Sequence, residues 1–125
     1  MNEISQLDPA AIERLQRLGG RAFVIKMIDL FSSYGAEKLA AAKSAGQAGN
    51  LVGIADAVHP IKSSAGNIGA RRVQELAQQI EQLARQSDGA SLPGLLDELN
   101  TAFVAAKNEL ELLKISAGNP PGGTK

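Results

Sequence analysis

The feature of this sequence that most constrains its fold is a series of apolar side chains, three or four residues apart, in its last third. An α-helix completes a turn about every 3.6 residues, so this spacing places the series along one helix face. The helix predicted over residues 92–113 therefore needs a partner surface to cover that face. The members of this stripe are Leu92, Leu95, Leu96, Leu99, Phe103, Ala106, Leu110 and Leu113.

Three earlier segments carry stripes of the same kind. Alanine and leucine dominate the sequence and only 3% of residues are aromatic, which favours helices packed on helices over a sheet. Apolar residues make up 44% of the chain, enough for a core. The three stripes are Phe23, Val24, Met27, Ile28 and Phe31, then Ile54, Val58, Ile61, Ala65 and Ile68, and finally Val73, Leu76, Ile80 and Leu83.

Capping and turn residues divide the chain into these helices. Asp8 can cap a short first helix, Pro9 suits its first turn, and Gly19 and Gly20 can end it. We therefore predict an all-α fold, an antiparallel up-and-down four-helix bundle with an additional short N-terminal helix. The alternative is two helical hairpins that need a partner to complete a core. Later caps, bends and helix ends are predicted at Gly35, Asn50, Gly69 and Ser91.

Charge and composition exclude several classes of function. The 13 basic residues balance the 13 acidic ones, so nothing indicates nucleic acid or an anionic membrane surface as a partner. There is no cysteine, which excludes disulfides, thiol catalysis and thiolate metal sites. No signal peptide or membrane span is recognisable, and we expect a cytoplasmic protein. The domain is predicted over residues 1–115, followed by a disordered tail, 116–125, that offers little apolar surface.

The only histidine lies in the stretch AVHPIKSSAGNIGA, residues 57–70, and a proline follows it. With each helical residue turned about 100° from the last, His59 and Lys62 fall on a second stripe about 140° from the apolar one. We therefore predict that His59 is exposed rather than part of the core. Pro60 is tolerable on that face, because water can satisfy the carbonyl group it frees. Ser63 and Gly66 share the stripe and are small, so another protein's backbone can approach the ring.

These residues resemble the histidine-containing phosphotransfer (HPt) domain family. Its pattern is a histidine, a lysine three residues later, a small residue next and a glycine ten after the histidine; His59, Lys62, Ser63 and Gly69 match it. The segment ARRVQELAQQIE is similar to the family's following helix, in which a glutamine or glutamate comes 22 residues after the histidine, here Glu81. The resemblance extends over about residues 8–114 and implies a four-helix bundle with an exposed histidine.

The resemblance also implies a function. His59 would accept a phosphoryl group from an aspartate of one receiver domain and pass it to an aspartate of another. Lys62 would stabilise the phosphoryl charge, and Glu81 would orient the imidazole, much as carboxylates orient metal-bound histidines. The partners would be response-regulator receivers and a hybrid sensor histidine kinase, with Mg²⁺ on the receiver and no cofactor or metal on this chain, which we expect to be a monomer. Candidate docking residues are Ser63 and Gly66, which are small, and Arg71 and Arg72, whose charge would complement the carboxylates of a receiver; for the two arginines, a solvated surface position without a role is the favoured alternative.

Other functions are weighed against this one. The phosphoacceptor region of a sensor kinase commonly has an acidic residue directly after its histidine, where this chain has Pro60, and no glycine-rich nucleotide-binding stretch follows. A bundle-type metal enzyme needs Glu-x-x-His spacing on facing helices, which is absent here. A helical interaction module in which His59 is incidental stays open as the alternative function.

Overall fold

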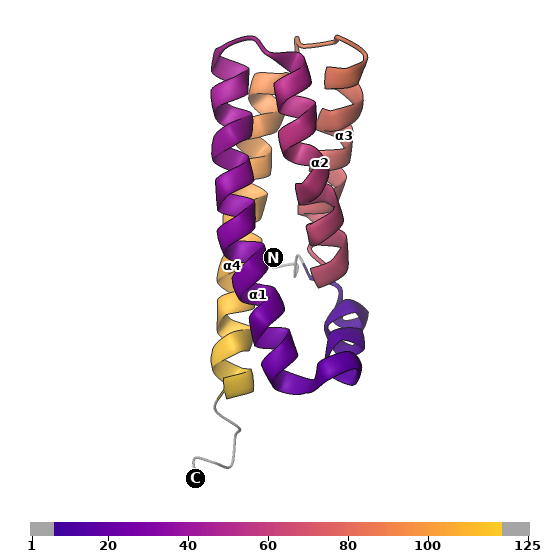
Figure 1. Ribbon diagram of the computed structural model, residues 1–125, viewed down its shortest axis with the longest axis vertical. Coiled ribbons are helices and arrows are strands. Elements are labelled where there is room, and N and C mark those ends of the chain that lie inside the picture. Colours follow the sequence, from indigo (N-terminus) through magenta and orange to yellow (C-terminus); the bar gives the residue numbers. More distant parts are fainter. Residues whose placement is uncertain (1–6, 119–125) are drawn as a thin grey trace, which may run out of the picture.

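The computed structural model describes residues 7–118 and has four helices that run alternately up and down (Figure 1). They are α1 (Pro9–Gln47), α2 (Leu51–Ile68), α3 (Arg71–Arg85) and α4 (Leu92–Gly118). Each helix packs mainly against its two neighbours in the ring order α1, α2, α3, α4. The predicted all-α four-helix bundle is therefore confirmed.

The helix boundaries follow local backbone chemistry. The Asp8 side chain accepts a hydrogen bond from the N–H of Ala10 at 3.1 Å, and Asn50 caps α2 by accepting from the N–H of Gly53 at 2.9 Å. Gly69 ends α2 in the left-handed region, at φ 83°. These two caps and this helix end agree with the sequence predictions, and they leave only Gly69 and Ala70 between α2 and α3.

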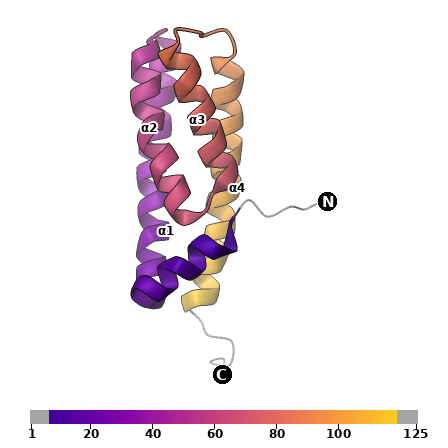
Figure 2. The same cartoon turned by 90° about the vertical axis from the view of Figure 1, so that its right-hand side faces the viewer.

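The N-terminal part of α1 differs from the rest of that helix in direction. Gly20 has φ 74° and ψ −170°, the one non-helical residue within α1, and only glycine adopts such a φ at little cost. Residues 9–19 cross the lower end of the bundle as a result (Figure 2). The backbone N–H of Asp8 donates to the carbonyl oxygen of Gly69 at 2.8 Å, which ties this segment to the end of α2.

The bend predicted at Gly35 is wrong. The helix continues through this residue, which is buried. A Cβ atom at Gly35 would overlap the ring of Phe103 on α4. Gly35 is therefore a site of close helix packing, where the absence of a side chain makes room for an aromatic ring.

The core contains the stripes that the sequence predicts. On α2 the five predicted residues are between 0% and 2% exposed, and Phe31 packs against Phe103 with ring centroids 5.1 Å apart. No helix within residues 7–118 has the length and hydropathy needed to cross a membrane. Helix α4 continues past the predicted domain boundary at residue 115 to Gly118. The rest of the predicted tail, 119–125, lies outside the described residues.

Candidate functional site

Helix α2 presents His59 on its solvent side. Ile54, Val58 and Ile61 point into the core, whereas the His59 side chain is 57% exposed. The helix continues through Pro60 without interruption. The prediction that the histidine lies outside the core is confirmed.

Glu81 on α3 contacts the histidine ring. Its Oε2 atom lies 2.8 Å from Nδ1 of His59, and the residue is only 8% exposed. An ionised carboxylate can only accept hydrogen bonds, so Nδ1 must carry the proton and donate it. The neutral imidazole then has its lone pair on Nε2. Glu81 is thus buried against the ring, rather than being one of the solvated glutamates on the surface of α3.

Lys62 contacts the other oxygen of the same carboxylate. Its Nζ atom is 2.9 Å from Oε1 of Glu81, and it lies one turn after His59 on α2. Burial raises the pKa of Glu81, but the hydrogen bonds and positive charge of Lys62 and His59 lower it more, and the pKa lies below the ordinary value of 4.5. Glu81 is therefore ionised at neutral pH, and three predicted site residues meet at one point.

Two further residues belong to this cluster and are absent from the sequence prediction. The guanidinium group of Arg85 lies 3.3 Å from Oε2 of Glu81 and 3.5 Å from Oδ1 of Asp56. The signal for Arg85 is its position four residues after Glu81, which puts both on one face of α3. Asp56 likewise comes three residues before His59 on α2. Glu81, which contacts the ring, is therefore linked through Arg85 to a second carboxylate on α2.

The predicted docking residues lie in different places. Ser63 is exposed one turn after His59, and Arg71 is exposed at the start of α3. Arg72 is paired instead with Glu98 on α4, at a distance of 3.1 Å. Arg72 lies about 180° around the axis of α3 from Glu81. The structure therefore does not bring Arg72 to the histidine.

Gly66 is less open than predicted. It is half-buried, and a Cβ atom there would lie 2.7 Å from Nε2 of Gln74 on α3. The end of the Gln74 side chain thus occupies the space that the missing side chain leaves. The surface next to Ser63 is consequently lined by a polar amide.

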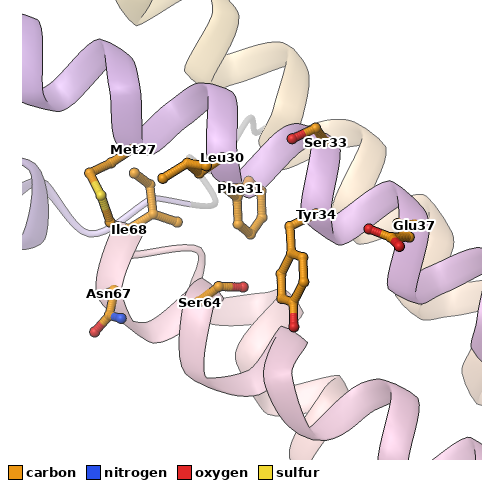
Figure 3. Close-up of a pocket in the computed structure, with 9 residues that line it drawn as sticks. All are labelled: Met27, Leu30, Phe31, Ser33, Tyr34, Glu37, Ser64, Asn67 and Ile68. Carbon is orange, nitrogen blue, oxygen red and sulfur yellow. The ribbon is translucent and has the colours of Figure 1, made fainter.

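An open apolar pocket lies between α1 and α2, beside the exposed face of α2 (Figure 3). Tyr34 extends from α1 toward Ser64 on α2 (Figure 3). Leu30 and Tyr34, which line it, are 50% and 42% exposed. The exposed face of α2 therefore begins at this pocket, on the side of α1, and continues through Asn67 and Ser63 to His59, on the side of α3. We call this face the exposed arc of α2. The lining residues are Met27, Leu30, Phe31, Ser33, Tyr34, Glu37, Ser64, Asn67 and Ile68.

The chemistry that this arrangement can perform follows from the two ring nitrogens. One is fixed as a donor to a buried carboxylate, and the other is left as a nucleophile on an exposed helix face. The ammonium group of Lys62 lies one turn away and can neutralise negative charge. Within residues 7–118, no group of three or more histidine, cysteine, aspartate or glutamate side chains is placed to hold a metal ion.

Comparison with known proteins agrees with this geometry. The family model described as Hpt domain matches residues 26–113. The fold is similar to the crystal structure of histidine-containing phosphotransfer protein B (HptB) from Pseudomonas aeruginosa PAO1, with a TM-score of 0.84 and 20% sequence identity. That match covers 90% of this chain and 96% of the other. A comparison with curated proteins found no match.

Proposed function

The chain belongs to the Hpt domain family and functions in histidine phosphotransfer within a two-component phosphorelay, and we propose that His59 is the residue that carries the phosphoryl group. The observation that supports this assignment is the 2.8 Å contact between Glu81 Oε2 and His59 Nδ1. It leaves Nε2 as the nucleophilic atom on the exposed side of α2. His59 is also the only histidine of the chain.

In the proposed transfer step, the covalent change on this chain is the formation of one bond to phosphorus. The lone pair of Nε2 forms the N–P bond as the O–P bond of a receiver's aspartyl phosphate breaks, and that bond's electron pair stays on the aspartate oxygen. The imidazole ring then bears a positive charge, which the Glu81 carboxylate stabilises through Nδ1–H. Transfer to a second receiver reverses these bond changes. Positioning and charge dominate such reactions.

The remaining charges have separate roles in this proposal. Lys62 interacts with the phosphoryl oxygens as a point charge. Mg²⁺ is expected on the receiver, where it would neutralise charge on the transferring group. This chain uses no ATP and works as a cytoplasmic monomer between the receiver of a hybrid sensor kinase and that of a response regulator.

We further propose that receivers dock across the exposed arc of α2 and the adjoining pocket. An aspartyl phosphate can reach Nε2 of His59 only if the receiver covers this face. Ser63, beside the ring, has a small side chain that permits close approach. The exposed Leu30 and Tyr34 supply apolar area next to it, the kind of surface that marks interaction sites.

The experiment measures the intact mass of this protein after incubation with Mg²⁺ and a panel of phosphorylated receiver domains. The wild type is expected to gain one phosphate that is lost in acid and retained in base, and His59→Ala to gain none. His59→Ala removes one hydrogen-bond partner of the buried Glu81 carboxylate, so it should lower the free energy of unfolding by about 1–3 kcal/mol. The protein should stay folded, because the ring itself is 57% exposed and Lys62 and Arg85 still contact Glu81. Equal labelling of both proteins, or no labelling of a folded wild type by any receiver, would favour the interaction module instead.

A further inference from the structure

Arg85 and His59 both contact the same carboxylate oxygen of Glu81. Oε2 of Glu81 lies 2.8 Å from Nδ1 of His59, and Nε and Nη2 of Arg85 each lie 3.3 Å from that same atom. Lys62 is paired with the second oxygen. Both oxygens of this buried carboxylate therefore face a cation, and the group is held against rotation about its last side-chain bond.

Asp56 provides the other half of the arrangement. Its Oδ1 atom lies 3.5 Å from Nη2 of Arg85 and comes from α2, the helix that carries His59. The guanidinium group, which is half-exposed, is thus held from both helices, and its planar donors suit two acceptors at once. Asp56 also offsets the charge that Arg85 brings near the ring. With a neutral imidazole, Lys62 and Arg85 balance Glu81 and Asp56.

We propose that Arg85, anchored by Asp56, is a positioning residue that orients the Glu81 carboxylate so that the Nδ1–H form of His59 predominates and Nε2 stays free. The proposal rests on the proposed function of His59 as phosphate carrier. Arg85 touches neither the ring nor the transferred group in this role. Its effect passes through Oε2 of Glu81, the atom that it shares with the histidine.

The test measures the tautomer of His59 directly, by ¹⁵N NMR of the imidazole ring in the full chain under alkaline conditions, where the ring is neutral. The chain has a single histidine, so both ring nitrogen signals belong to His59, and their couplings to the carbon-bound ring protons distinguish Nδ1 from Nε2. The wild type is expected to show a protonated Nδ1. In Arg85→Gln the ratio of the Nδ1–H to the Nε2–H form should fall about two- to fivefold, the effect of one half-exposed ion pair.

Arg72→Gln is the matched control for the NMR measurement. Its side chain is 49% exposed against 50% for Arg85, and it is also paired with two carboxylates on α3 and a neighbouring helix. It lies on the opposite face of α3, so its replacement should leave the tautomer ratio unchanged. Asp56→Asn should shift the ratio in the same direction as Arg85→Gln but less. Arg85→Lys keeps the positive charge but loses the planar guanidinium donors, so its ratio should lie between those of Arg85→Gln and the wild type.

The outcomes separate this proposal from the function on which it rests. The positioning role is overturned if Arg85→Gln and Arg72→Gln give the same tautomer ratio as the wild type. A shifted ratio in Arg85→Gln alone supports the role even where no receiver transfers phosphate to His59, because the NMR signal requires no partner. Transfer to the wild type with an unshifted ratio in Arg85→Gln would leave the phosphate carrier intact and remove only Arg85 from its mechanism.

Discussion

At the scale of single residues, the site is a buried carboxylate with three cationic or donor groups around it. His59 and Lys62 come from α2, whereas Glu81 and Arg85 come from α3. Glu81 is 8% exposed, so its charge is stable there only because these partners replace water. The same contacts that stabilise the ion also fix which ring nitrogen is protonated.

Replacement of Lys62 by alanine should slow phosphoryl transfer without preventing it. The variant loses the ammonium charge beside the ring while His59 and Glu81 remain, and we expect a transfer rate about tenfold lower, equivalent to ~1.4 kcal/mol in the barrier. The measurement is a time course of phosphate uptake from a phosphorylated receiver. Lys114→Ala is the matched control, because Lys114 has a similar exposure, 29% against 31%, and pairs with Asp29 and Glu111 away from the site. Equal rates in the two variants would remove Lys62 from the transfer step.

Glu81 should also contribute to the pH dependence of stability. Its pKa is lowered on folding, so the ionised group stabilises the folded state above the ordinary value of 4.5, and that stabilisation is lost as the pH falls through the lowered pKa. The difference in unfolding free energy between the wild type and Glu81→Gln should therefore be largest near neutral pH and shrink in acid. Urea unfolding at a series of pH values measures it, with the exposed Glu75→Gln as control. A difference that grows on acidification would contradict the lowered pKa.

At the scale of helices, one face of α2 packs in the core and the opposite face carries the histidine. Five apolar residues cover one side, and His59 and Ser63 lie on the other. The rotation of about 100° per residue is enough to predict this division from the sequence. Because Pro60 lies on the rim of the exposed side, the helix accommodates it without a break.

The contacts between helices are harder to predict than the faces. Arg85 and Asp56 meet only because of the register of α3 against α2, which depends on the short connection through Gly69 and Ala70. Sequence spacing within one helix cannot supply that register. The histidine, the lysine and the glutamate were predictable from spacing and family resemblance, whereas the ion pair that joins the two helices was not.

The exposed leucine on α1 offers a test of the docking surface. Leu30→Ser should slow transfer from a receiver severalfold, because it removes apolar contact area beside the α2 face, while the intrinsic reactivity of His59 toward phosphoramidate stays the same. Leu112→Ser, which also removes an exposed leucine but one that lines a separate pocket against residues 7–13, should leave the receiver reaction unaffected. Transfer rates measured against receiver concentration will show whether only the first variant weakens docking. Parallel losses in both variants, or in neither, would exclude the pocket as the docking surface.

At the scale of the whole molecule, close packing between α1 and α4 completes the bundle on the side opposite the α2 and α3 pair that carries the site. Helices α1 and α4 approach each other where Gly35 faces the ring of Phe103, which also packs on Phe31. The sequence predicted a bend at this glycine, because a glycine inside a helical pattern looks the same whether it bends the chain or makes room for a neighbour. Only the position of Phe103 across the bundle distinguishes the two.

Gly35→Ala should therefore destabilise the fold, although alanine is the better helix former. The added methyl group overlaps the Phe103 ring, at a cost of about 1–3 kcal/mol that the helical gain of roughly 1 kcal/mol offsets only in part, so we expect the free energy of unfolding to fall by up to about 2 kcal/mol. Gly94→Ala on α4 is the matched control, since a Cβ atom there has no neighbour within 4 Å, and it should stabilise the protein slightly. Thermal and urea unfolding of both variants measure the two effects. If both substitutions stabilise the protein, Gly35 does not hold α1 and α4 in close contact, whereas opposite signs establish that this packing, rather than helix flexibility, requires the glycine.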